Sequence, residues 1–542
     1  MTAPLTATGV LARLAVRRDR VRLTVWLLAL AALVGSTASA IEGLYATPAA
    51  VAENAATRAS SVVARAFTGP ATGGNVGALA VAEALVFTCV LAALMNVLTV
   101  VRHTRQNEEL GRAELIGSTA VGRHAGLVAA LLMAGVADVL LAGACAVALL
   151  ANGLPVAGSL AAGAAVGASG LAFAGITAVA AQVAEGARGA IGLASAALGL
   201  AYLLRAVGDA TGDIGPDGMT VTATWPSWLS PIGWAQRLEP FGDERWWPLG
   251  LFALFTALVL GLAGWLNVHR DVGTGMIPVR RGRTRAARSL CTPFGLAWRL
   301  QRGMLLGWLV GVALFGLAFG GIGDQVDDLF GSEQSAELMR QLGGGGSLVD
   351  AYFAAMMGLM GVIVAGYTLQ ALLRLRTDET GGPTEAVLAT GVSRTRWVVA
   401  HVLVALVGTV LVLLALGLGT GLAYGVVAGD LGDAVGDLLV TTLAQLAPTL
   451  VLAGFVVAVF GLVPRAAAAL AWAAFGVCLV VGQFGALLEL PRAVIDLSPF
   501  SHLPDLPAQS LTAGPLAALT GLSVLLLMVG LVGFRRRSLT LQ

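Results

Sequence analysis

The sequence predicts an all-α polytopic membrane protein of about twelve transmembrane helices, built as two fused six-helix repeats. Three observations support this fold class. Hydrophobic residues make up 57% of the 542 residues and charged residues only 12%, unlike the composition of a soluble domain. Apolar stretches of about 20 residues, long enough to cross a bilayer as helices, recur along the whole chain. A polar segment that follows the second stretch is repeated 271 residues later.

The repeated segment, here called the duplicated loop, has its copies at 105–123 and 376–394. Seven residues match without a gap, in the pairs Arg105/Arg376, Glu108/Glu379, Gly111/Gly382, Glu114/Glu385, Thr119/Thr390, Val121/Val392 and Arg123/Arg394. Because the spacing is half the chain length, we predict a fused duplication. The first six-helix repeat would cover 1–277, an arginine-rich linker 278–293, and the second repeat 294–542.

The predicted spans follow the apolar stretches in order. In the first half they are 23–42, 79–101, 124–151, 158–184, 190–206 and 248–268. In the second half they are 304–323, 351–373, 397–426, 434–462, 466–485 and 514–534. Glycine and alanine dominate these stretches, which favours close packing of helices in a membrane. Strands of a membrane barrel would alternate polar and apolar residues, and these stretches do not.

The arginine distribution predicts the orientation of the chain. All basic residues other than histidine are arginine, and 26 of the 33 fall on the side that holds both termini. By the positive-inside rule, both termini are expected in the cytoplasm.

Each half begins with a basic segment before its first span, at 11–22 and 294–302. Such a segment lies along the lipid headgroups or serves as a simple positive anchor, and the same residues suit both interpretations. The linker carries five arginines and is expected to associate with anionic lipid. Nucleic-acid binding is not expected, since nothing near the linker resembles a folded basic module.

The second copy of the duplicated loop has the residues of a helix break followed by a short helix. Gly381-Gly382 would end the preceding helix, and Pro383 suits the first position of a new one. Glu385 would then lie near the positive end of that helix, and Ser393 would cap the next span. We therefore predict a short helix between two spans at the cytoplasmic side.

These features resemble the tandem-repeat permeases of type-2 ABC exporters, close to the tetronasin-type multidrug permeases that export polyketide antibiotics. The matching features cover essentially the whole chain. They are the basic pre-span segment, the Glu108-Glu-x-Gly-Arg-x-Glu114 loop, the Leu-Ser-Pro elements at 229–231 and 497–499, and the arginine tail at 535–537. The resemblance implies the type V exporter fold, pre-span elbow helices and a multi-pass location in a bacterial plasma membrane.

In that family the loop carries a coupling helix that contacts the ATPase. The residues implied as ATPase-coupling are Glu108, Gly111, Arg112, Glu114 and Arg123 in the first copy and Glu379, Gly382, Glu385 and Arg394 in the second. The copies differ where Pro383 stands for Arg112, so the two docking sites are expected to be unequal. The alternative is that these charges only solvate a turn.

The ATPase is expected on a separate polypeptide. A phosphate-binding P-loop needs a lysine, and this chain contains none. Two coupling loops would recruit two ATPase subunits, expected to be two copies of one protein, and these would bind the ATP and Mg²⁺. This chain is expected to bind no cofactor or metal itself and to have no catalytic residues of its own.

A few polar and large apolar residues within spans are candidates for the path of a hydrophobic or amphipathic cargo. They are Phe87, Met95, Asn96, Thr99, Asp138, Met356, Met357, Tyr367 and Gln370. Asp138 is the carboxylate expected deepest in the bilayer, where a charge usually has a partner. Hydrogen bonding between helices and core packing are the alternative roles for all of them.

Two other functions remain open from the sequence. A proton-coupled secondary multidrug transporter also suits twelve spans, although Asp138 would be its main support. An integral membrane enzyme acting on lipid-linked substrates would need converging acids, bases or metal ligands. The sequence does not specify the cargo, because an apolar path selects mainly by size and hydrophobicity.

Overall fold

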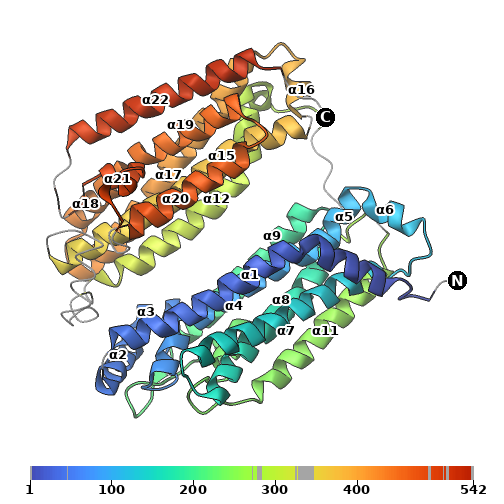
Figure 1. Ribbon diagram of the computed structural model, residues 1–542, viewed down its shortest axis with the longest axis vertical. Coiled ribbons are helices and arrows are strands. Elements are labelled where there is room, and N and C mark those ends of the chain that lie inside the picture. Colours follow the sequence, from blue (N-terminus) through green and yellow to red (C-terminus); the bar gives the residue numbers. More distant parts are fainter. Residues whose placement is uncertain are drawn as a thin grey trace. The chain divides into compact units, whose positions relative to one another are not determined.

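The computed structural model describes residues 3–45, 47–271, 273–277, 284–323, 326, 347–381, 383–485, 490–504, 506–507, 509 and 512–538. The chain forms two compact units, Met1–Gly282 and Arg283–Gln542. In Figure 1 the first unit runs from blue to green and the second from yellow-green to red.

The prediction of an all-α polytopic membrane protein is confirmed. Among the described residues, eleven helices are long and apolar enough to cross a membrane. A shorter apolar helix, Ala467–Gly482, lies where the span 466–485 was predicted. The strands in the described part are β1 (Asp213–Ile214) and β2 (Val221–Thr222), which form one antiparallel pair.

The described part of the first unit contains six long helices and several short ones. In chain order its helices are α1 (Thr8–Leu44), α2 (Pro48–Ser60), α3 (Val62–Phe67), α4 (Val76–His103), α5 (Arg105–Glu109), α6 (Arg112–Gly117), α7 (Ala125–Ala151), α8 (Val156–Val183), α9 (Ala187–Ala210), the 3₁₀ helix η1 (Trp225–Leu229), α10 (Pro231–Gln236) and α11 (Pro248–Val268).

The second unit follows a similar order. In its described residues the helices are η2 (Arg288–Cys291), α12 (Pro293–Gly320), α15 (Leu348–Thr380), α16 (Pro383–Leu388), α17 (Arg394–Ala428), α18 (Leu431–Ala444), α19 (Leu446–Leu462), α20 (Ala467–Phe484), α21 (Arg492–Ile495), η4 (Pro499–His502) and α22 (Ala513–Arg536).

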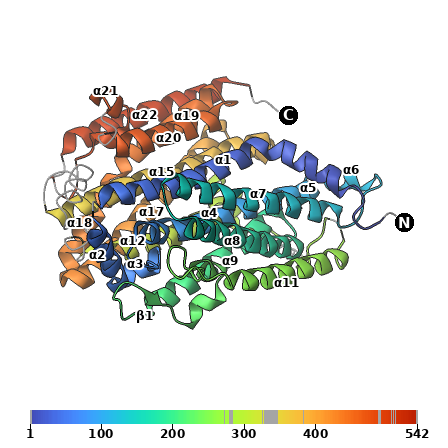
Figure 2. The same ribbon diagram turned by 60° about the horizontal axis from the view of Figure 1, so that its bottom comes forward.

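Helix α8 lies at the centre of the first unit and packs against α4, α7, α9 and α11. Figures 1 and 2 show α7, α8 and α11 side by side. Small residues allow this close approach. A Cβ added at Gly163 would collide with the carbonyl oxygen of Ala142, and one at Gly167 would lie 2.9 Å from the carbonyl oxygen of Asp138. The helix backbones therefore touch where the sequence provides glycine.

The second unit uses glycine in the same way. Helix α12 packs along α17, and α19 packs along α22. A Cβ at Gly316 of α12 would lie 2.8 Å from the carbonyl oxygen of Leu416 on α17. Gly461 of α19 and Gly530 of α22 face each other with no room for a side chain at either position.

The pre-span segments differ from the expected elbow helices. Residues 8–22 continue into the first span as the single helix α1, and residues 293–302 continue into the second unit's first span as α12. No proline or glycine falls between Leu11 and Trp26 to end the helix. The basic residues therefore extend the transmembrane helix instead of forming a separate one.

The predicted span 434–462 is divided into α18 and α19 at Gln445. Pro448 explains the division, because its ring clashes with the carbonyl group four residues earlier, that of Ala444. Helix α18 ends at this residue.

The repeated Leu-Ser-Pro elements each start a short helix. The Ser230 hydroxyl accepts hydrogen bonds from the backbone N–H groups of Ile232 and Gly233 at the start of α10. The Ser498 hydroxyl accepts one from the N–H group of Phe500 at the start of η4. In both cases proline takes the first helical position, where it loses no hydrogen bond.

Candidate functional site

The first copy of the duplicated loop folds as two short helices, α5 and α6, joined at Gly111. Gly111 has a φ of 68°, a left-handed conformation that glycine adopts without strain. Figures 1 and 2 show both helices at the same end of the first unit as the N-terminus. In the second unit the loop contains one short helix, α16, which begins at Pro383. Gly382 lies outside the described residues.

Glu108 is anchored inside the first unit. Its carboxylate accepts hydrogen bonds from both terminal nitrogens of Arg270, with Nη1 at 2.9 Å from Oε2. Arg105 Nη1 and the backbone N–H group of Gly273 donate to the same carboxylate. The Glu108 side chain is 11% exposed. Because Arg270 follows the last long helix, α11, this contact joins the loop to the end of the unit.

Glu379 has the equivalent anchor in the second unit. Arg537, which follows α22, donates from Nη1 to Oε1 at 2.7 Å and from Nη2 to Oε2 at 2.9 Å. The Arg537 guanidinium also lies over the rings of Phe460 and Phe534. The Glu379 side chain is 2% exposed. Both units thus hold the loop glutamate with an arginine that comes after their last long helix.

Arg123 and Arg394 cap the ends of the same last helices. Arg123 Nη2 donates to the carbonyl oxygens of Val268, at 2.7 Å, and Arg270, at 3.0 Å, at the end of α11. Arg394 Nη1 donates to the carbonyl oxygen of Arg537, at 2.7 Å, at the end of α22. A cation at a helix C-terminus satisfies free carbonyl groups and is stabilised by the helix dipole.

The structure therefore divides the predicted coupling residues into two groups. The side chains of Glu108, Glu379, Arg123 and Arg394 hold the loop in place within their own unit. The side chains of Arg112, Glu114 and Glu385 are exposed. Glu114 lies beside Leu115, whose side chain is 74% exposed.

Asn96 and Asp138 form a buried hydrogen bond between α4 and α7. Asn96 Nδ2 donates to Asp138 Oδ1 at 2.8 Å. The second unit pairs the hydroxyl groups of Thr368 and Thr409 between α15 and α17 at 2.6 Å. Polar residues that join helices inside each unit match the packing alternative for these positions.

The other predicted path residues are scattered through the two units. Met95, Thr99, Met357 and Tyr367 are buried, Met356 is half-buried, and Phe87 and Gln370 are exposed. The Gln370 side-chain oxygen accepts a hydrogen bond from Trp308 Nε1 at 3.2 Å. None of these residues lines either of the two pockets described next.

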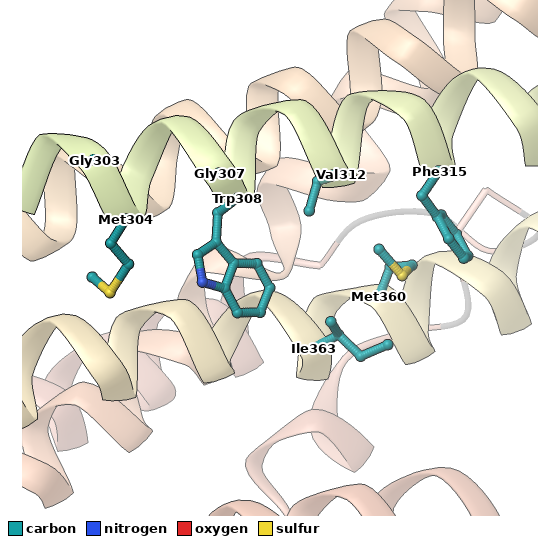
Figure 3. Close-up of a pocket in the computed structure, with 9 residues that line it drawn as sticks. Gly303, Met304, Gly307, Trp308, Val312, Phe315, Met360 and Ile363 are labelled. Carbon is teal, nitrogen blue, oxygen red and sulfur yellow. The ribbon is translucent and has the colours of Figure 1, made fainter. Parts of the chain in front are cut away.

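An apolar groove of about 530 Å³ lies between α12 and α15 of the second unit. Figure 3 shows Met304, Trp308, Val312 and Phe315 pointing from α12 toward residues of α15. The lining residues are Gly303, Met304, Gly307, Trp308, Gly311, Val312, Phe315, Met360 and Ile363. The sequence prediction missed this groove, although Gly303, Gly307 and Gly311, spaced four residues apart, were a signal for space along one face of α12.

A second cavity, of about 800 Å³, lies in the first unit behind the duplicated loop. Glu108, Arg112 and Arg123 are among the residues that line it.

No group of three or more His, Cys, Asp or Glu side chains within the described part could hold a metal ion.

Comparison with known proteins places the chain in a family. The multidrug efflux system permease protein Rv1217c of Mycobacterium tuberculosis (strain ATCC 25618 / H37Rv) is 39% identical to it over 539 residues. The match covers 98% of this chain and 95% of the relative. The chain belongs to the multidrug efflux system permease family. Residues 290–535 also match the family model described as the C-terminal domain of multidrug efflux system permease Rv1217c.

Family membership confirms part of the sequence interpretation. The protein is a multi-pass membrane permease, and an efflux role is supported by the relative of similar length. The sequence prediction missed the anchoring residues Arg270 and Arg537. The available signal was an arginine just after the last apolar stretch of each half.

Proposed function

We propose that the permease is the membrane subunit of an ATP-driven exporter of the type-2 ABC class, with the type V fold. Its motor would be a separate ATPase subunit, because this chain contains no lysine to complete a P-loop. The ATPase would bind ATP and Mg²⁺, and the permease would contribute no catalytic residue.

One observation carries the proposal. In both units a buried glutamate-arginine pair and an arginine cap hold the duplicated loop to the end of the last long helix. The same arrangement leaves Glu114 and Glu385 exposed on short helices. A short helix that is fixed to the ends of several spans transmits a force from a soluble partner to those spans. An exporter needs such a helix where its membrane subunit contacts the ATPase.

Two such loops on one chain suit two copies of one ATPase. The loops are not identical, since Arg112 in the first is replaced by Pro383 in the second. Closure of the ATPase dimer on ATP would then move both loops, with unequal contacts at the two sites.

The cargo proposed is a hydrophobic or amphipathic compound, such as a polyketide antibiotic, an ionophore or a drug, moved outward. The relative is named for multidrug efflux. The apolar groove between α12 and α15 has the chemistry to hold part of an apolar molecule.

Charge reversal at the two exposed glutamates tests the coupling role. The double variant Glu114→Arg, Glu385→Arg should keep its fold, because neither side chain has a partner within the described residues. We expect ATPase binding and ATP-dependent export to fall at least about tenfold. Pull-down of the ATPase and cargo transport in proteoliposomes measure the two effects.

The matched control is the double variant Glu42→Arg, Glu53→Arg, which reverses two exposed acidic residues away from the loop. It should change neither ATPase binding nor export. Normal ATPase stimulation and export by the Glu114/Glu385 variant would contradict the assignment of these helices as coupling elements.

A further inference from the structure

The cavity behind the first duplicated loop has walls from several parts of the first unit. Residues of α1 and α6 lie on it, together with the ends of α4 and α8 and the start of α7. The segment before α1 closes one side, because the backbone N–H groups of Gly122 and His124 donate to the carbonyl oxygens of Thr6 and Pro4. Several segments of the first unit therefore enclose the cavity together, and its volume is about 800 Å³.

Helix α6 stands over this cavity without a packed core beneath it. Its residues Arg112, Ala113, Ile116 and Gly117 line the cavity, and none of its six residues is buried. The equivalent helix of the second unit, α16, is better packed. Its Thr384 is 3% exposed, and Val387 and Leu388 pack against the core of the second unit. The second unit thus has packed side chains on α16 at the position where the first unit has the cavity under α6.

The lining of the cavity is basic and apolar. Four arginines line it (Arg18, Arg112, Arg123 and Arg270), and Glu108 is the one acidic residue among the lining side chains of the described part. The pair with Arg270 already neutralises Glu108. Arg18 has a 3.5 Å contact with Asn107, and Arg112 has no hydrogen-bond or ion-pair partner among the described residues. Positive charge therefore remains available on both the α1 wall and the α6 wall.

Apolar side chains continue from the arginines. Leu11 and Leu14 precede Arg18 on the cavity face of α1, at the three- and four-residue spacing that places side chains on one helix face. Ile116 of α6 and Leu127 of α7 also line the cavity. A ligand that fits this lining has an anionic head and an apolar tail.

We propose that this cavity binds an anionic phospholipid, with its phosphate between Arg18 and Arg112 and an acyl chain along Leu11, Leu14 and Ile116. Arginine forms paired hydrogen bonds with phosphate, and basic pockets between membrane helices on the cytoplasmic side bind lipid headgroups. The bound lipid would supply the packing that α6 lacks. Pro383, at the position of Arg112, cannot supply this contact in the second unit.

Lipid binding here requires the loop to lie at the cytoplasmic headgroup level, and it does not require the ATPase. Native mass spectrometry of the purified full chain measures retained lipid after titration with phosphatidylglycerol or phosphatidylcholine of the same acyl chains. We expect the chain to bind phosphatidylglycerol in preference to phosphatidylcholine, and the Arg18→Ala, Arg112→Ala variant to lose about tenfold in affinity for phosphatidylglycerol.

The control variant, Arg17→Ala, Arg20→Ala, removes two exposed arginines of α1 outside the cavity. It should bind phosphatidylglycerol as the unaltered chain does. Equal losses in both variants, or no loss in either, would overturn the proposal.

A second pair of variants tests the tail without changing charge. Gly126 lines the cavity and Gly143 does not, and both lie on α7 with open space around an added side chain. Gly126→Phe should weaken phosphatidylglycerol binding, whereas Gly143→Phe should not. Inorganic phosphate alone should not displace the lipid. Displacement by inorganic phosphate, or binding that is insensitive to Gly126→Phe, would show an anion site without a lipid tail and reject the proposal.

Discussion

The buried pair Glu379–Arg537 shows how a single contact fixes the duplicated loop. Two parallel hydrogen bonds join the carboxylate to the guanidinium, and the guanidinium also lies against two aromatic rings. A carboxylate that is 2% exposed needs such a partner, because an unpaired buried charge is strongly destabilising. Glu108 and Arg270 form the same contact in the first unit. The match Glu108/Glu379 in the sequence thus has a structural cause.

Arg537→Ala should destabilise the second unit by about 3 to 5 kcal/mol, since it leaves Glu379 buried without its main partner. Thermal or denaturant unfolding of the purified permease measures this loss. Arg536→Ala, at the exposed neighbouring position, should change stability by less than about 0.5 kcal/mol. Equal effects of the two substitutions would show that the pair does not stabilise the loop.

Asp138 belongs to a hydrogen bond between helices, and this favours a structural role over proton coupling. Asp138→Asn keeps an oxygen that can accept from Asn96 Nδ2, so export should remain within about twofold of the unaltered permease. Cargo transport in proteoliposomes checks this. A loss of most export in Asp138→Asn, together with loss on collapse of the proton gradient, would favour a proton-coupled transporter.

At the scale of helices, hydropathy predicted the spans well because each needs about 20 apolar residues in sequence. The capping roles of Ser230 and Ser498 also follow from local sequence alone. Contacts between distant segments were not predictable in this way. Nothing near Glu108 in the sequence indicates Arg270 as its partner, and the cavity behind α6 depends on where the residues before α1 lie.

The α12–α15 groove gives a prediction for one element. A Cβ at Gly307 meets no atom within 4 Å, so Gly307→Leu should fold normally and fill part of the groove. We expect this substitution to lower the export of an apolar cargo several-fold, which corresponds to a loss of about 1 kcal/mol in the free energy of cargo binding. Gly261→Leu, on α11 with similar open space, is the matched control.

Binding of a fluorescent apolar cargo and its export in proteoliposomes measure the effect of the two leucine substitutions. Unchanged cargo handling in Gly307→Leu would show that cargo does not use the groove.

At the scale of the whole molecule, two compact units carry loops that are anchored by the same kinds of contact. The units differ in the packing of α6 and α16. They also differ at one matched position of the loop, which is Arg112 in the first unit and Pro383 in the second. The central proposal is that a separate ATPase acts on both loops to drive export. Export of a hydrophobic cargo from proteoliposomes with the permease alone, with its ATPase, and with an ATPase unable to hydrolyse ATP tests it most directly. Export should require the active ATPase and ATP, and equal export by the permease alone would rule out an ATP-driven mechanism.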